Sequence, residues 1–239
     1  WKNNGHGLMN VSDAIKESCD VFFYEISKKI GIDKIAQVAE DFGLGKIYDV
    51  PLPNQKKGII PSRDWKKKKY DESWYPGETL ISAIGQGFVL TNPLQLAVMT
   101  SIIASNGKNV KPNIIKQNNQ IEFEKLEKYQ NAIKIIKSSM FKVVNENKGT
   151  AYNSRSEFAP FAGKTGTSQV RRITVAERES EDFRKKEVEW KKRDHALFVG
   201  YMPVEKPKYA VSVVIEHGGS GASTAAPIAK EIFQFTKNL

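Results

Sequence analysis

The segment Lys164-Thr165-Gly166-Thr167 combines a cation, two hydroxyls and one residue without a side chain. The alternating pattern around it predicts a strand over 161–170, and Gly166 would leave the edge of that strand uncovered. A peptide could pair its backbone along this edge as an added strand. The cation and the hydroxyls could then hold a carboxylate at the end of that peptide. Taken alone, the four residues fit a purely structural strand at least as well.

Ser18-Cys19-Asp20 is a second place where groups suited to proton transfer gather. On a continuous helix, the side chains of Ser18 and Asp20 would point about 200° apart and could not share a site. They converge only if the helix breaks there, and Asp20 as the cap of a new helix would provide the break. The alternative is that both side chains only cap a helix.

The elements that would position these residues are helices in the first half of the chain. Apolar residues at helical spacing predict two short helices within 10–30, the first capped by Asn10 or Ser12 and the second capped by Asp20 and ending at Gly31. A third helix is capped by Asp33 and ends at Gly43. Two more are predicted from Pro93 to Asn106-Gly107 and over 129–147. Residues 44–80 are rich in Pro, Gly, Lys and aromatics, and predict a long structured loop.

The second half of the chain changes to a period of two. Strands are expected at 161–170, 195–202 and 208–216, separated by a charged excursion over 171–194. A last helix over 222–237 is expected to place Ile228, Ile232 and Phe235 on its inner side. This order predicts an α+β fold, with an all-helical lobe over about 8–107 beside an antiparallel sheet lobe over about 108–239 that is covered by helices.

Composition excludes several classes of protein. The chain has 239 residues, a net charge of +10 and 40% hydrophobic residues, which is enough apolar material for a core. No run approaches the roughly 18 apolar residues of a membrane span, and the single cysteine excludes an intramolecular disulfide. Basic runs at 66–69 and 184–193 come without a nucleic-acid motif, so we expect no nucleic-acid partner; solvated loops or attraction to anionic lipids explain them. Because the chain starts at Trp1, we expect a piece of a longer protein.

Ordered motifs along nearly the whole chain resemble the transpeptidase domain of elongation-type class B penicillin-binding proteins. They are Gly5-His6-Gly7, Glu17-Ser18-Cys19-Asp20, Pro61-Ser62-Arg63-Asp64-Trp65-Lys66, Trp74-Tyr75-Pro76-Gly77-Glu78-Thr79, Ile84-Gly85-Gln86-Gly87, Thr91-Asn92-Pro93, Lys148-Gly149-Thr150-Ala151, Lys164-Thr165-Gly166-Thr167 and Asp194-His195-Ala196. The resemblance implies the penicillin-binding/β-lactamase-like transpeptidase fold without its N-terminal part. It also implies a D,D-transpeptidase that cross-links peptidoglycan stem peptides ending in D-Ala-D-Ala through a serine acyl-enzyme, and that β-lactams acylate.

The family uses the motifs Ser-x-x-Lys, Ser-x-Asn/Asp and Lys-Thr/Ser-Gly in this order. The second matches Ser18-Cys19-Asp20 and the third Lys164-Thr165-Gly166, but no Ser-x-x-Lys precedes Ser18. Two later matches, Ser105–Lys108 and Ser139–Lys142, are out of order, so we reject them. The nucleophile motif is therefore missing from this chain, and we expect the fragment alone to be inactive.

The resemblance also implies a role for each matching residue. Ser18 would relay a proton, Lys164 would keep Ser18 polarised, and Asp20 would orient the substrate amide or the lysine of the missing motif. Thr165 and Thr167 would bind the substrate carboxylate, beside Gly166 on the strand edge. The backbone N–H of Thr167 would be one donor of the oxyanion hole. The parent would lie in the bacterial inner membrane, with this domain in the periplasm and a membrane glycan polymerase as partner.

The chemistry requires no cofactor, but the resemblance implies a structural zinc in the full-length parent. His6 and Cys19 would be two of its ligands, together with two upstream acidic residues. Because a structural zinc site has four ligands, this chain would supply half of it. The alternative is a loop histidine and a small buried thiol.

Two other functions stay open at this point. A non-catalytic binding or scaffold module could keep the transpeptidase fold after losing its nucleophile. A β-lactamase or carboxypeptidase of the same fold would need a residue that activates water for deacylation, and the motifs do not point there. The presence of Ser-x-x-Lys upstream in the parent gene separates a transpeptidase from a scaffold.

Overall fold

The computed structural model describes residues 2, 5–115, 123–157, 159–171 and 188–236. Its helices are α1 (Val11–Glu17), α2 (Asp20–Ile30), α3 (Ile32–Asp41), α4 (Arg63–Tyr70), α5 (Pro76–Ala83), α6 (Pro93–Ala104), α7 (Gln130–Asn145) and α9 (Ala226–Thr236). Its strands are β1 (Ala162–Ser168), β2 (His195–Met202) and β3 (Tyr209–Ile215). Most of the charged excursion predicted over 171–194 lies outside the described residues. Within the described part of the chain, no helix has the length and apolar character needed to cross a membrane.

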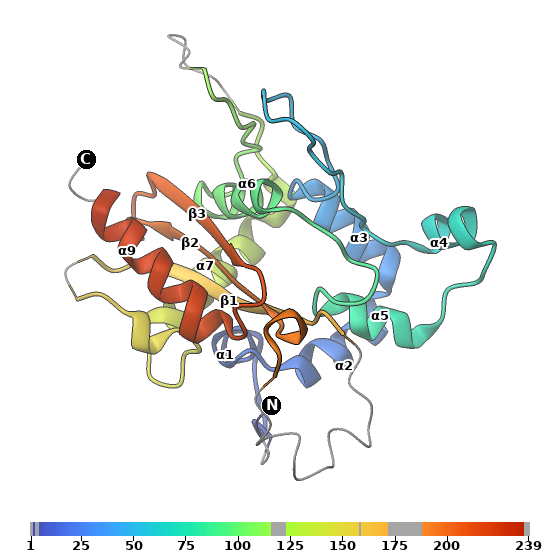
Figure 1. Cartoon of the computed structure of the whole chain (residues 1–239), viewed down its shortest axis with the longest axis horizontal. Coiled ribbons are helices and arrows are strands. Elements are labelled where there is room, and N and C mark those ends of the chain that lie inside the picture. Colours follow the sequence, from blue (N-terminus) through green and yellow to red (C-terminus); the bar gives the residue numbers. More distant parts are fainter. Residues whose placement is uncertain (1, 3–4, 116–122, 158, 172–187, 237–239) are drawn as a thin grey trace.

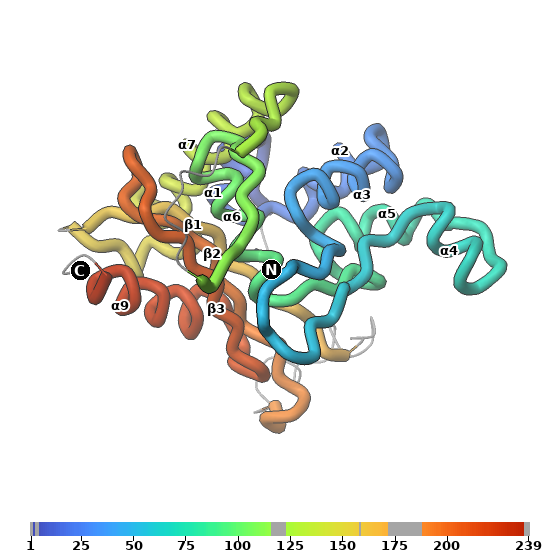
Figure 2. Tube along the Cα trace, turned by 90° about the horizontal axis from the view of Figure 1, so that it is seen from above, coloured from blue at the N-terminus to red at the C-terminus, as the bar shows by residue number. Residues whose placement is uncertain are grey.

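The three strands form one antiparallel sheet in the order β1-β2-β3. Lys164 pairs with Val199 in the first ladder, and Val199 pairs with Ser212 in the second. Helices α6 and α7 pack on one face of the sheet and α9 packs on the other (Figures 1 and 2). Helices α2 to α5 gather to one side of the sheet, on the right in Figure 1. The predicted helices and strands around the sheet are therefore confirmed, and the lobe boundary near 107 stays a prediction.

Several predicted helix ends are confirmed by their capping contacts. The Asn10 side chain accepts a hydrogen bond from the Asp13 N–H at 2.9 Å, so Asn10 rather than Ser12 caps α1. Pro93 is the first residue of α6, with the Asn92 side chain as its cap. Gly31 ends α2 with a positive φ of 79°, which suits a residue without Cβ.

Two predicted caps are wrong. Cys19 is the extended residue before α2, and Asp20 is the first helical residue rather than the cap. Gly31 also precedes α3, so Asp33 lies in the first turn of that helix. The Asp33 carboxylate instead accepts a hydrogen bond from the backbone N–H of Arg63 at 3.0 Å. The helix dipole stabilises a carboxylate in the first turn as well as one at the N-cap. An aspartate near the start of a helix therefore does not tell from sequence alone which of the two positions it occupies.

The long loop predicted over 44–80 is wrong in part, because this segment contains α4 and the start of α5. Ser62 caps α4 by accepting from the Trp65 N–H at 3.1 Å. Lys66 belongs to the lysine run that suggested a solvated loop, yet only 2% of its side chain is exposed. It forms ion pairs with Glu78 and Glu72, and these charges raise its pKa against the opposing effect of burial.

The inner face predicted for the last helix is also wrong. Phe233 is 1% exposed and packs against Phe161 in the core, whereas Phe235 is 70% exposed. Ile228 and Ile232 lie on the outer side, at 37% and 39% exposure. The side that faces the sheet carries the small residues Ala226 and Ala229, and Ala225 lies directly before the helix; these residues let the helix approach closely. The pattern of large apolar residues alone therefore gave the wrong side.

Two substitutions on α9 test this orientation. Phe233→Ala removes a core side chain and is expected to lower the free energy of unfolding by about 3–5 kcal/mol. Phe235→Ala serves as the matched control and is expected to cost less than about 1 kcal/mol, because that ring is exposed. Denaturant unfolding of both variants measures the difference. Equal losses would show that the assigned face is wrong.

Candidate active site

A sharp break between α1 and α2 brings Ser18 and Asp20 toward one site. Ser18 ends α1 in the left-handed conformation, with φ 54° and ψ 59°, and its N–H donates to carbonyls of the last turn. Cys19 is extended, and α2 starts at Asp20 in a new direction. A non-glycine residue with positive φ is uncommon, and such strained residues concentrate at functional sites. The predicted break is confirmed, although its cause is Ser18 rather than a cap at Asp20.

Lys164 on β1 reaches across to this break. Its Nζ donates to Ser18 Oγ at 3.0 Å and to the Thr165 carbonyl oxygen at 2.9 Å. The Thr165 hydroxyl lies 2.7 Å from the hydroxyl of Thr150, and the Thr150 N–H donates to the carbonyl of Lys16 at the end of α1. Lys164 and Thr165 of β1 thus connect the strand to the end of α1, Lys164 directly and Thr165 through Thr150.

The electrostatics of Lys164 differ from those of an exposed lysine. Burial lowers the pKa of its ammonium from 10.5 to about 8, and the negative charge of Asp20 opposes this change. Near neutral pH this lysine is mostly protonated but close to its midpoint. A group with such a pKa can both polarise the Ser18 hydroxyl and exchange a proton with it.

The other predicted residues follow Lys164 along β1. Gly166 pairs with Leu197 and Thr167 pairs with Ala196 in the β1–β2 ladder. Thr167 is exposed and Thr165 is half-buried. The structure therefore brings Ser18 and Lys164 into direct contact and places Asp20 close enough to affect the charge of Lys164. Thr165 to Thr167 continue the same strand.

The proposed metal ligands do not make a complete site. Cys19 is buried and has no disulfide partner. Among the described residues, no group of three or more His, Cys, Asp or Glu side chains could hold a metal ion. Since a structural zinc needs four ligands, His6 and Cys19 do not fit it by themselves, and no step of the chemistry is assigned to a metal.

Two residues of the motifs had no role in the sequence interpretation and prove to contact β1. Thr150 contacts Thr165, as described above. The Gln86 side chain donates from Nε2 to the Thr167 carbonyl oxygen at 2.8 Å and accepts from the Gln169 N–H at 3.3 Å. The only sequence signals for them were Lys148-Gly149-Thr150-Ala151 and Gly85-Gln86-Gly87 themselves, because contacts over such separations cannot be read from spacing.

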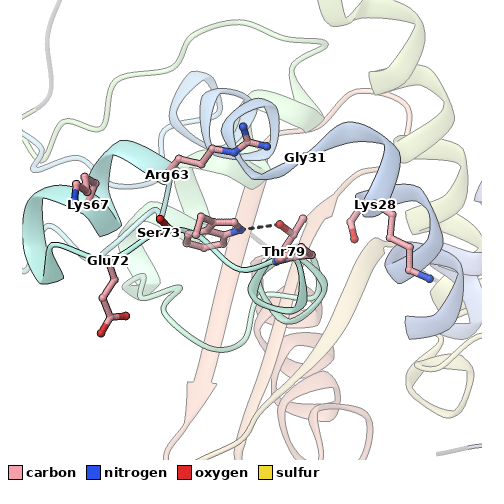
Figure 3. A pocket seen from close by; sticks show the side chains of 10 residues that line it. Lys28, Gly31, Arg63, Lys67, Glu72, Ser73 and Thr79 are labelled. Atoms are coloured by element: carbon pink, nitrogen blue, oxygen red, sulfur yellow. Dashed lines mark hydrogen bonds between the residues drawn. The ribbon is translucent and has the colours of Figure 1, made fainter.

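A separate hollow of about 510 Å³ lies between α2, α4 and α5 (Figure 3). None of the residues that line it belongs to the Ser18–Lys164 cluster. Its cationic residues already form ion pairs, namely Lys28 with Glu25, Arg63 with Asp33, and Lys67 with Asp71. The dashed line in Figure 3 is the hydrogen bond from the Trp74 indole to the Thr79 hydroxyl. We therefore assign the chemistry to the polar cluster at β1 rather than to this hollow.

Comparisons with known proteins identify the family of the chain. A family model described as "Penicillin binding protein transpeptidase domain" matches residues 1–234. The chain belongs to this transpeptidase family, and its fold is the one seen in PBP2 transpeptidase structures, as the sequence predicted.

Three relatives show how closely the chain follows the family. "Peptidoglycan D,D-transpeptidase MrdA" of Haemophilus influenzae is 35% identical over 255 residues, covering 100% of this chain and 38% of that protein. A structure titled "Complex between Penicillin-Binding Protein (PBP2) and MreC from Helicobacter pylori" has a TM-score of 0.87 at 35% identity, covering 100% of this chain and 42% of that one. "Structural coordination of polymerization and crosslinking by a peptidoglycan synthase complex" has a TM-score of 0.75 at 32% identity, covering 94% and 37%. The chain thus spans well under half the length of these relatives.

The lowered pKa of Lys164 is directly measurable. Titration of the labelled lysine side chain by NMR is expected to give a midpoint near 8. Asp20→Asn removes the negative charge that favours the ammonium, so the midpoint is expected to fall further. Asp64→Asn is the control, because Asp64 pairs with the exposed Lys68. A rise in the Asp20→Asn variant, or an equal shift in the control, would contradict the assigned electrostatics.

Proposed function

We propose that this chain is part of a peptidoglycan D,D-transpeptidase that cross-links stem peptides through a serine acyl-enzyme and that β-lactams acylate. The observation that carries the proposal is the hydrogen bond from Lys164 to Ser18 beside the edge of β1, with Asp20 acting on the same cation. Membership of the transpeptidase family and a relative named as a D,D-transpeptidase support the enzyme class.

The reaction would use a serine from a Ser-x-x-Lys motif in a longer form of the protein. Its oxygen attacks the penultimate carbonyl of a stem peptide, and the bond to the last D-alanine breaks. The attacking serine loses its hydroxyl proton and the departing amine gains one, and Ser18, hydrogen-bonded to Lys164, would relay this proton from the serine to the amine. An amine of a neighbouring stem then attacks the acyl-enzyme, loses its proton by the reverse route and releases the serine.

The strand edge would hold the substrate during both steps. The hydroxyls of Thr165 and Thr167 would bind the terminal carboxylate. The backbone N–H of Thr167 would donate to the oxyanion, together with a donor from the nucleophile motif. Asp20 would keep Lys164 charged in the resting state, because its negative charge opposes the effect of burial. A role of Asp20 in orienting the substrate amide is part of the same proposal.

Two structural relatives suggest which partners the longer protein has and where it works. One structural relative is a PBP2 in complex with MreC, and another belongs to a peptidoglycan synthase complex that couples polymerization and crosslinking. We propose that the longer protein works beside a membrane glycan polymerase, with this domain in the periplasm. The alternative function, a scaffold that keeps the fold without catalysis, loses support from the intact Lys164–Ser18 contact.

The chain by itself is expected to remain unlabelled by a fluorescent penicillin. The described part of the chain offers Ser105 and Ser139 as out-of-order motif serines, but their hydroxyls donate to helix carbonyls, and Ser139 is fully buried. Gel fluorescence and intact-mass measurement test this. Covalent labelling at either serine would show that a real nucleophile was dismissed.

In a longer form that contains Ser-x-x-Lys, Lys164→Ala is expected to abolish detectable acylation by the same penicillin. The substitution removes the donor that polarises Ser18 and the charge beside the strand edge. Lys68→Ala is the control, because that side chain is 75% exposed and forms an ion pair with Asp64, away from the Ser18 break. Acylation of Lys164→Ala at the wild-type rate would remove the basis of the proposed function.

A further inference from the structure

The side chain of Gln86 completes the free edge of β1 beyond Thr167. Within the described part of the chain, β1 is an edge strand of the sheet, and β2 pairs with one of its two sides. On the other side, the Gln86 amide donates to the Thr167 carbonyl oxygen at 2.8 Å and accepts from the Gln169 N–H at 3.3 Å. A residue on a parallel neighbouring strand would make the same two bonds around Ser168. The two polar atoms of the Gln86 side-chain amide therefore substitute for the backbone N–H and C=O of one residue on such a strand.

The main chain holds Gln86 in position for these bonds. Its N–H donates to the Ile81 carbonyl at 3.1 Å, in the last turn of α5. Gly85 and Gly87 on either side have φ values of 75° and 70°, which glycine adopts without strain. Helix α5 packs on α2, and α2 starts at Asp20. Gln86 thus ties β1 to the helices that begin at the proposed site.

On the edge of β1 that Gln86 contacts, the backbone N–H of Thr167 lies between two carbonyl oxygens that already accept hydrogen bonds. The Thr165 carbonyl accepts from Lys164 Nζ, and the Thr167 carbonyl accepts from Gln86. In an antiparallel ladder, the N–H and C=O of one residue point to the same side of the strand. The Thr167 N–H therefore faces the same edge as its carbonyl, between the contacts of Lys164 and Gln86. This N–H is the oxyanion donor in the proposed reaction.

We propose that Gln86 is a positioning residue, which fixes the end of β1 so that the Thr167 N–H points at the developing oxyanion. This proposal rests on the proposed function, and Gln86 acts through Thr167 rather than on the substrate. The Thr167 carbonyl has two lone pairs, so Gln86 leaves one for an N–H of the incoming peptide. Donors fixed in advance stabilise a transition state more than donors that must first be ordered.

Two variants separate the two bonds of Gln86. Gln86→Ala removes both, whereas Gln86→Glu keeps an acceptor for the Gln169 N–H and loses the donor to Thr167. Gln130→Ala is the matched control, because the Gln130 amide also donates to backbone carbonyls, those of Asn106 and Leu126. Neither of those carbonyls belongs to β1 or to the Ser18 break.

The first readout is acylation by a fluorescent penicillin in a longer form that contains Ser-x-x-Lys. Both Gln86 variants are expected to lower the rate constant of the acylation step by roughly 10–100-fold, since small misplacements of reacting groups cost about this much. The dissociation constant of the complex before acylation is expected to change by less than about threefold. The control is expected to keep the wild-type rate. A wild-type or faster rate for Gln86→Ala would overturn the proposal.

The second readout is hydrogen exchange at the Gln169 N–H, which does not depend on activity. Exchange is expected to accelerate in Gln86→Ala and to stay slow in Gln86→Glu. Unchanged exchange in Gln86→Ala would show that the Gln86 side chain does not hold the Gln169 N–H and would overturn the proposal. If the wild-type protein is not acylated at all, the proposed function fails while this exchange measurement still decides whether Gln86 holds the strand. The two failures are therefore distinguishable.

Discussion

The hydrogen bond between Lys164 and Ser18 depends on one backbone conformation, and the rest of the site depends on that bond. Ser18 has φ 54°, which costs a non-glycine residue roughly 1–2 kcal/mol relative to the right-handed helix. If α1 continued through Ser18, the hydroxyl and the Asp20 carboxylate would leave in nearly opposite directions. The strained residue turns both toward the strand that carries Lys164. The strained conformation therefore allows the Lys164–Ser18 hydrogen bond, which joins the helix break to the sheet across 146 residues of sequence.

The burial that holds Lys164 in place also weakens its charge. Desolvation lowers its pKa to about 8, and the charge of Asp20 limits the effect. A fully exposed lysine would stay charged but would lose much of its electrostatic strength to water, since charges interact less in a high dielectric. A lysine buried to the same extent without a carboxylate nearby would have a still lower pKa. The observed arrangement lies between these limits, and this is the range in which a cation can polarise a hydroxyl and still exchange a proton.

Local signals in the sequence predicted most of the elements but not the contacts between them. Caps and period changes located α1, α6, α7 and the three strands, because these depend on neighbouring residues. Helix α4 was missed because its lysines suggested a solvated surface. In the structure Lys66 is buried and forms ion pairs with Glu72 and Glu78. The face of α9 was misassigned because the sheet selects small residues for close packing. Each error arose where a distant partner decides the environment of a side chain.

The same limit applies to the candidate site. Ser18, Asp20 and Lys164 were found because their motifs carry reactive groups, but Thr150 and Gln86 are ordinary polar residues whose importance appears only in their contacts. With them, several different elements hold β1 in place. Strand β2 pairs along one edge, the Gln86 amide occupies the end of the other, and Thr150 fixes the Thr165 hydroxyl.

The fourth support of β1 comes from the turn before α9. A Cβ at Gly221 would collide with the backbone of Gly166 and with the carbonyl of Leu197, so this turn packs directly against the strand. Gly221 can approach only because it has no side chain. A strand supported in this way presents its free edge without needing to reorganise when a peptide arrives. Since electrostatic catalysis depends on donors that are already in place, the packing behind β1 contributes to the chemistry as directly as the residues that face the substrate.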